Sequence, residues 1–194
     1  MKTKKQIKAE FILSHWQLRD GVIFTRWGNK PVAFSNKSKD GRRFQMIKIN
    51  GKWAGVYIHD AYFVLFHRRP IAEGKILHHI DGDYTNNSIN NLIELTHRQH
   101  QRIHAYLKDD PLRAIRPNGT AWAYYWNDDN GVHHCRSFHF INEAMEYRNQ
   151  TEEPYRQELR ALGLNCKRAG NRITENMLRR RNHIPNHRLW RTSV

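Results

Sequence analysis

Histidine is concentrated in one short stretch of this chain, and that stretch restricts the possible folds more than any other feature. Residues 76–104 hold five of the 13 histidines of the 194-residue sequence. Acidic and basic side chains nearly balance there, although the whole chain carries a formal net charge of +15. A surface that neutralises phosphate groups is cationic, so this stretch serves another purpose. Clustered imidazoles indicate a metal site, which a fold must assemble from separate elements.

The first two histidines, His78 and His79, are adjacent at the end of a short apolar segment. The turn-forming sequence Ile80-Asp81-Gly82-Asp83 follows them. Adjacent side chains of an extended segment point to opposite faces, so the two histidines cannot have the same role. We expect one to bind a metal ion and the other to act on a water molecule.

A helix is predicted to begin at Thr96. Thr96 and Gln99 have the spacing of a T-x-x-Q capping box, and no Pro or Gly interrupts the sequence before Pro111. Within this helix His100 and His104 are four residues apart, so they share a face.

Three imidazoles can meet if this helix packs against the preceding strand. His78 would come from the strand and His100 and His104 from the helix, where His97 lies on the same stripe. Three protein ligands leave one coordination position open, which is typical of catalytic rather than structural metal sites.

The order of these residues resembles the motif of the HNH endonucleases. The matching parts are the segment 78–83, the sequence Asn90-Asn91-Leu92, Leu95-Thr96 and the helical histidines. Asn91 lies 12 residues beyond His79, and His100 lies 21 residues beyond it. The resemblance implies a ββα-metal finger of strand, loop, strand and helix.

The same resemblance implies hydrolysis of a DNA phosphodiester with one divalent metal ion. His79 would be the general base that deprotonates the attacking water, and Asn91 would fix the geometry of the loop. His78 and His100 would bind the metal, with His104 as a third ligand. Many phage relatives carry Asp and Asn at the first two of these positions. The nitrogen-rich set leaves the ion open between Mg²⁺ or Mn²⁺ and Zn²⁺, Ni²⁺ or Co²⁺.

The sequence from Phe11 to about Phe66 predicts a small antiparallel sheet before this motif. Its strongest turn signal is Asn50-Gly51, because both residues tolerate the positive φ of a type I′ hairpin. The expected strands are rich in Val, Ile, Phe and Thr and cover residues 21–27, 31–35, 43–49 and 52–58.

A short helix is predicted over residues 59–69, with Pro70 as its stop. It carries two further histidines, His59 and His67. Either could join the site, or both could be helix surface or polar contacts of the core.

A second small module is predicted after the break at Asp109-Asp110-Pro111. Strands at 121–127 and 132–140 precede a helix over 143–150, capped at or near Asn142. The module resembles the three-stranded-sheet-plus-helix DNA-binding domain of plant ethylene-response factors and some phage integrases and homing nucleases. The matching residues are Ile115, Arg116, Gly119, Trp122, Ala123, Arg136, Phe138, Phe140, Glu143, Ala144 and Tyr147.

That resemblance implies DNA contacts from the strands of this module. Arg116 and Arg136 are assigned to phosphate or guanine contacts. Trp122 and Tyr124 share one strand face. We expect this face to touch DNA, with Trp122 also packing against the module's own helix; packing alone is the alternative.

Basic residues dominate the end of the chain. Residues 156–194 contain ten Lys or Arg and two Glu. The run Arg179, Arg180 and Arg181 either contacts DNA phosphates or forms a solvated face of a helix.

The predicted fold class is therefore α+β. An N-terminal antiparallel sheet leads into the ββα-metal nuclease core, and a small three-stranded-sheet-plus-helix module and a basic helical tail follow. The corresponding domains are residues 1–110, 111–150 and 151–194.

Composition narrows the function classes further. The pI of about 10.2 favours a nucleic-acid partner, although small ribosomal and chromatin-like proteins are equally basic. Two cysteines are too few for a disulfide framework, and no apolar run is long enough to span a membrane. A monomeric protein in the cytoplasm of a bacterial host cell is expected.

The function predicted from all of these features is site-specific cleavage of double-stranded DNA by a homing-type endonuclease of phage or mobile-intron origin. One alternative is a noncatalytic DNA-binding regulator with a structural metal site, which the intact His79 argues against. Another is a nonspecific nuclease, which has little use for a recognition module.

Overall fold

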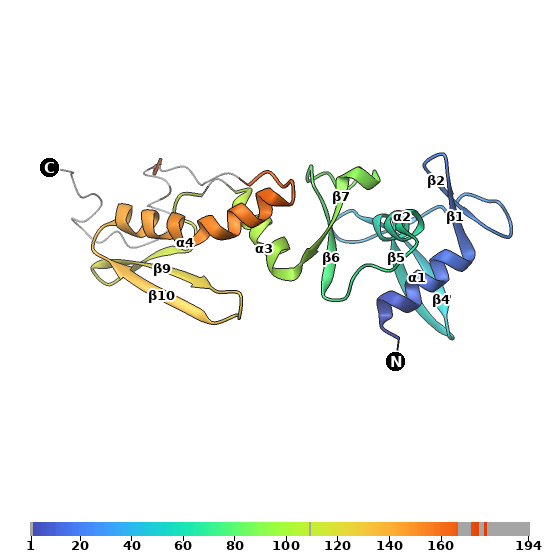
Figure 1. Cartoon of the computed structure of the whole chain (residues 1–194), viewed down its shortest axis with the longest axis horizontal. Helices are drawn as coiled ribbons and strands as arrows, with labels where there is room; N and C mark the ends of the chain where they lie inside the picture. Colours follow the sequence, from blue (N-terminus) through green and yellow to red (C-terminus); the bar gives the residue numbers. More distant parts are fainter. Residues whose placement is uncertain (1, 109, 167–171, 175–176, 178–194) are drawn as a thin grey trace. The chain divides into compact units, whose positions relative to one another are not determined.

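The computed structural model describes residues 2–108, 110–166, 172–174 and 177. The chain forms two units, Met1–His100 and Gln101–Val194, and the boundary falls inside helix α3 (Figure 1). Within the described residues no helix is both long and apolar enough to cross a membrane.

The first unit contains three small antiparallel sheets, β1-β2, β3-β4-β5 and β6-β7 (Figure 1). Its elements, in chain order, are α1 (Lys4–His15), β1 (Trp16–Arg19), β2 (Val22–Thr25), β3 (Asn36–Lys37), β4 (Arg43–Ile49), β5 (Lys52–Tyr57), α2 (Ile58–His67), β6 (Lys75–His79), η1 (Ile89–Asn91), β7 (Leu92–Thr96) and α3 (His97–Tyr106).

Helix α1 was not among the predicted elements, and its last turn occupies residues expected to be extended. Its N-terminus is a capping box in which the Thr3 hydroxyl accepts from the Gln6 N–H, and the Gln6 side chain accepts from the Thr3 N–H. The T-x-x-Q pattern at residues 3–6 is the sequence signal for the start of this helix.

The hairpin prediction is confirmed at Asn50-Gly51. Both residues have positive φ, 48° and 79°, and the turn joins β4 to β5 with Ile49 opposite Lys52. The strand expected at 31–35 is wrong. Phe34 has a φ of 44°, which breaks the extended backbone and turns its ring into the core.

The core of this unit lies where α1 and α2 pack against each other and against β4. Helix α2 begins one residue before its predicted start and ends at His67, because Arg68 adopts a left-handed φ of 55°. The packing of this helix thus sets the positions of Tyr57, its N-cap at the end of β5, and of His59 in its first turn. The buried apolar residues are Ala9, Ile12, Trp16, Ile23, Phe34, Ile47, Val56, Ala61, Val64 and Leu65.

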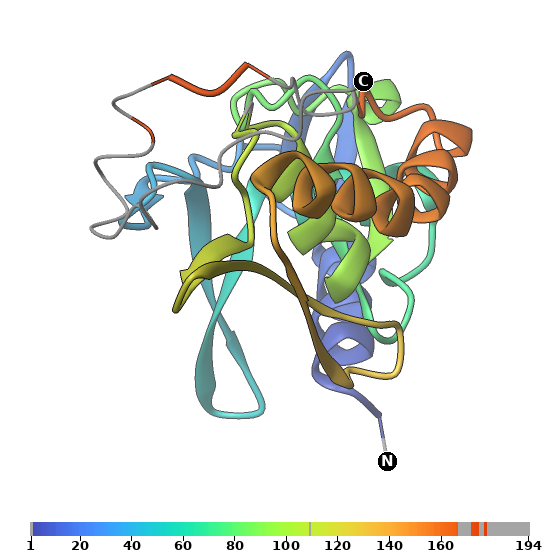
Figure 2. The ribbon, with the colours of Figure 1, turned by 90° about the vertical axis from the view of Figure 1, so that its left-hand side faces the viewer.

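The second unit contains the predicted three-stranded sheet and helix. Strands β8 (Ile115–Asn118), β9 (Ala121–Asn127) and β10 (His133–Phe138) form an antiparallel sheet in the order β10-β9-β8. Helix α4 (Ile141–Ala161) runs along β9 and β10 (Figures 1 and 2).

Helix α4 is longer than predicted and starts differently. Its N-cap is Phe140, whose N–H donates to the Glu143 carboxylate at 3.3 Å, so Asn142 is not the cap. The helix continues past Gln150 and through Pro154. Leu159, in its last turn, is fully buried and belongs to the packed part of the unit.

Trp122 and Tyr124 lie in the core of this unit, which corrects their assignment to DNA contact. Their exposed fractions are 1% and 2%, and both pack with Ile141 and Met145 of α4. A side chain covered by the helix cannot reach a bound nucleic acid. The alternative, packing against the module's own helix, is what the structure shows.

Buried charges also lie under α4. The Glu152 carboxylate accepts from Arg113 and, at 3.0 Å, from Arg156, and only 4% of the Glu152 side chain is exposed. Arg148 is fully buried and donates to the Pro111 carbonyl and to Asn149. The predicted contacts of Arg179, Arg180 and Arg181 lie outside the described residues.

Candidate active site

The β6–β7 hairpin separates the two adjacent histidines, as the alternation of an extended strand requires. His78 is opposite Ile93 and His79 is opposite Leu92 in the antiparallel register. The His78 ring lies 5.2 Å from the ring of His100 on α3. The His79 ring lies on the α2 side, 5.4 Å from the ring of His59.

Helix α3 begins with the predicted capping box. The Thr96 N–H donates to the Gln99 side chain at 2.8 Å, and the Gln99 N–H donates to the Thr96 hydroxyl at 3.2 Å. These two bonds satisfy N–H groups of the first turn. The cap thereby fixes where the helix starts, and so which helical residues face β6.

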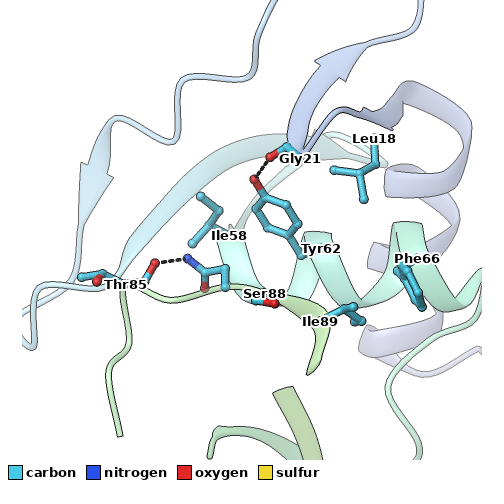
Figure 3. Close-up of a pocket in the computed structure, with 9 residues that line it drawn as sticks. Leu18, Gly21, Ile58, Tyr62, Phe66, Thr85, Ser88 and Ile89 are labelled. Carbon is cyan, nitrogen blue, oxygen red and sulfur yellow. Dashed lines mark hydrogen bonds between the residues drawn. The ribbon is translucent and has the colours of Figure 1, made fainter. Parts of the chain in front are cut away.

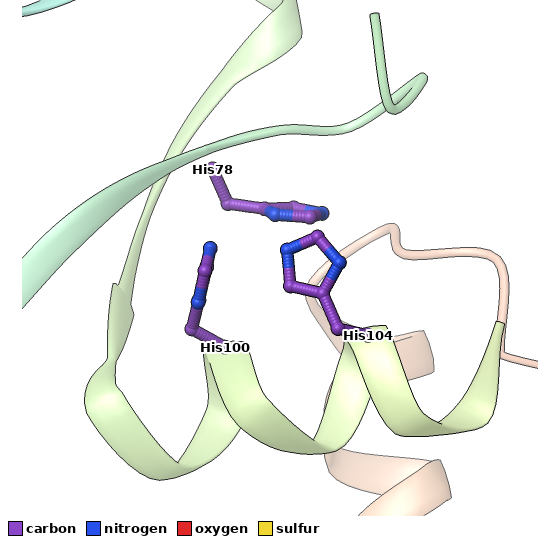
Figure 4. A group of neighbouring side chains, drawn as sticks. All are labelled: His78, His100 and His104. Carbon is purple, nitrogen blue, oxygen red and sulfur yellow. The ribbon is translucent and has the colours of Figure 1, made fainter. Parts of the chain in front are cut away.

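His78, His100 and His104 form a group that could hold a metal ion (Figure 4). One ring nitrogen from each lies within 4.8 Å of the other two. The first residue is buried and the other two are progressively more exposed. Three imidazole nitrogens this close together fit a divalent ion, because small rotations about the side-chain bonds bring nitrogen ligands to a shared centre. His97 is exposed and is not a member of this group.

The loop between β6 and β7 is held together by Asn91 and Asp81. The Asn91 amide donates to the Asp81 carboxylate at 2.8 Å and to the Asn86 carbonyl at 2.9 Å. Its oxygen accepts from the Asp81 N–H at 3.0 Å. Hydrogen bonds from Asn91 and Asn86 lower the pKa of Asp81, so this carboxylate remains an acceptor.

His79 is buried and has two side-chain neighbours, of which the sequence predicted only one as a possible site residue. Its Nε2 lies 3.2 Å from Oδ1 of Asn87, and His59 contacts its ring edge-on at 79°. Asn87 belongs to an asparagine-rich loop, so nothing in its spacing distinguishes it from its neighbours. His59 was one of two optional site residues, and the structure brings it to His79. His67 instead packs on Phe63.

The two titratable residues in the first turn of α2, His59 and Asp60, have shifted pKa values. Burial, with a smaller contribution from His79, lowers the pKa of His59 to about 3. Burial raises the pKa of Asp60 to about 6, against the opposing effect of Lys8 and Lys5. The His59 ring is therefore neutral at pH 7.

A cavity of about 500 Å³ adjoins the loop between β6 and β7 (Figure 3). Ile58 and Tyr62 of α2 line one side, and Tyr62 donates to the Gly21 carbonyl. Thr85 and Ser88 of the loop line the other.

Arg116 and Arg136 are both exposed but lie on opposite faces of the β8–β10 sheet. Arg116 is opposite Ala123, whereas Arg136 is opposite Tyr124, whose ring is covered by α4. The Arg136 guanidinium accordingly stacks 4.4 Å from the ring of Tyr147 on the helix. Only Arg116 of this pair is on the face that α4 leaves open.

Comparison with known proteins gives a family match for part of the chain. Residues 61–102 match the family model described as HNH endonuclease; this segment contains most of α2, all of β6 and β7, and the first part of α3. A solved structure described as "DNA binding and cleavage by the HNH homing endonuclease I-HmuI" aligns with a TM-score of 0.38 and 17% identity, covering 63% of this chain and 71% of that one. A comparison with curated proteins finds no match.

Proposed function

We propose that this protein is a metal-dependent endonuclease that hydrolyses phosphodiester bonds in double-stranded DNA. The observation that carries the proposal is the three-histidine group, because two of its members, His78 and His100, lie inside the matched HNH domain. His104 follows one turn later on the same helix.

His78, His100 and His104 would hold one divalent cation in this mechanism. The ion supplies Lewis-acid stabilisation of the charge that develops on the phosphate. Mg²⁺ or Mn²⁺ is the proposed ion in the cell, and an all-imidazole set also accepts Zn²⁺, Ni²⁺ or Co²⁺.

His79 acts as the general base. In its neutral form it takes a proton from a water molecule aligned with the phosphorus atom. The new P–O bond forms as the bond to the 3′ oxygen breaks, and the leaving oxygen takes a proton from solvent water, so the products carry 3′-hydroxyl and 5′-phosphate ends. Asn91 acts as a positioning residue, since its three hydrogen bonds set the loop that follows His79.

DNA recognition is assigned to the second unit and the basic end of the chain. Arg116 lies on the open sheet face, and Arg136 lies at the edge strand β10. The formal charge of +15 supports binding to a polyanion. We propose that these elements make cleavage site-specific, of the homing type, by a monomer.

A plasmid assay tests the proposal. Supercoiled plasmids carrying fragments of phage genomic DNA are incubated with the protein and Mg²⁺ or Mn²⁺, and the ends are mapped. The expected result is nicked or linear DNA with recurrent ends. His79→Ala should abolish cleavage while DNA binding stays within about twofold, and His67→Ala should leave both intact because His67 is outside the site.

Two results contradict this function. DNA that is bound but stays supercoiled with each divalent ion indicates a noncatalytic DNA-binding regulator. Ends scattered without recurrence indicate a nonspecific nuclease.

A further inference from the structure

Asn87 connects the loop between β6 and β7 to the ring of His79. Its Oδ1 lies 3.2 Å from His79 Nε2. Its Nδ2 donates at 3.0 Å to the carbonyl of Thr85, which is labelled in Figure 3. The residue is half-buried beside a buried imidazole. The contact therefore joins two side chains with restricted freedom.

The Thr85 carbonyl determines which way the Asn87 amide faces. A carbonyl oxygen can only accept, so the NH₂ group must be the end of the amide that points to Thr85. The amide oxygen is then the end that meets His79. Because that oxygen can only accept, His79 Nε2 must carry a hydrogen.

Thr85 is itself held in place by Asp83. The Asp83 carboxylate accepts from the Thr85 N–H at 2.8 Å and from its hydroxyl at 2.7 Å. These bonds lower the pKa of Asp83, which keeps it an acceptor. The chain of contacts from Asp83 through Thr85 to Asn87 thus presents one fixed acceptor to the imidazole.

We propose that Asn87 is a positioning residue that fixes the Nε2–H tautomer of His79 and so makes Nδ1 the atom that takes the proton from water. The inference rests on the proposed function, in which His79 is the general base. A neutral imidazole has one lone pair on a ring nitrogen, and placing the hydrogen on Nε2 leaves that pair on Nδ1. His59 meets the ring edge-on, which restricts its plane but does not select a tautomer.

Nitrogen-15 NMR of histidine-labelled protein reads the tautomer without any cleavage. The spectrum is recorded at a pH where the ring is neutral, and the His79 signals are assigned from their loss in His79→Ala. The expected wild-type pattern is Nε2–H alone. Asn87→Leu should give a mixture of the two tautomers, whereas Asn87→Asp keeps an acceptor and should retain Nε2–H.

Steady-state cleavage separates positioning from binding. Asn87→Leu should lower kcat about 10- to 100-fold with KM for DNA unchanged, because a mixture of tautomers removes only part of the roughly 10²–10⁴-fold that general-base catalysis contributes. Asn87→Asp should recover most of kcat. Ser88→Ala is the matched control, since Ser88 is the exposed next residue of the same loop and makes no side-chain cap contact.

Each outcome decides the proposal. An Nδ1–H pattern in the wild type, or an unchanged pattern in Asn87→Leu, overturns it. A kcat for Asn87→Leu equal to that of Ser88→Ala, or an equal loss in Asn87→Asp and Asn87→Leu, also overturns it. If the tautomer responds to Asn87 but the wild type does not cleave DNA, the endonuclease function fails and the tautomer assignment stands.

Discussion

Glu152→Gln should strongly destabilise the second unit, although it replaces only one carboxylate oxygen of a buried side chain with an NH₂ group. The Glu152 carboxylate lies between the guanidinium groups of Arg113 and Arg156, and Arg156 is fully buried. The amide keeps the shape of the side chain but removes the negative charge that compensates these cations. Removing one partner of a buried pair costs about 3–5 kcal/mol. That is a large part of the roughly 5–15 kcal/mol that stabilises a typical domain.

Glu153→Gln provides the matched control at the next position of α4. Its partner is Arg160, and the two side chains are 39% and 41% exposed, so the pair is worth about 0–1 kcal/mol. Urea unfolding followed by tryptophan fluorescence compares both variants, because Trp122 is in the core of this unit. If Glu152→Gln unfolds within about 1 kcal/mol of Glu153→Gln, the buried carboxylate does not compensate the arginines and the reasoning is wrong.

Three further predictions concern the metal group, pH and the end of the chain. His100→Ala should lower Zn²⁺ affinity by more than about 100-fold, measured by titration calorimetry, whereas His97→Ala should not change it because His97 is outside the group; equal affinities would place the site elsewhere. Burial raises the pKa of Asp60 to about 6, so the folded state holds this proton more tightly than the unfolded state. The unfolding free energy should fall, relative to Asp60→Asn, by up to about 3 kcal/mol as pH rises from 3.8 through 6, and a pH-independent difference would contradict the burial argument. A chain ending after Cys166 keeps the packed end of α4 and should bind DNA more weakly, with a plot of log K against log salt that is shallower by about 0.9 per lost phosphate contact; equal slopes would show that the removed residues make none.

Local signals in the sequence were sufficient where one or two residues determine the backbone. Thr96 and Gln99 begin α3, and Asn50-Gly51 forms the β4–β5 turn, because caps and tight turns are closed by residues adjacent in the chain. The fixed pitch of a helix likewise placed His100 and His104 on one face. These features were predictable without knowledge of tertiary contacts.

Contacts between distant segments were not predictable in the same way. Asn87 reaches His79 only because Asp83 and Thr85 fold the intervening loop, and several asparagines of that loop have similar spacing. Phe34 leaves the extended conformation because its ring packs with Trp16 in the core, 5.6 Å away. Tertiary packing overrides the local preference in such cases.

The β8–β10 sheet shows most clearly what alternation can and cannot decide. Alternation correctly placed Trp122 and Tyr124 on one face, but it does not tell which face a helix covers. Helix α4 covers that face, so a nucleic acid can approach only the other one, which carries Arg116 and Tyr125. Arg136 belongs to the covered side and stacks on α4. Direct base readout by this sheet would therefore depend on Arg116 rather than on Arg136.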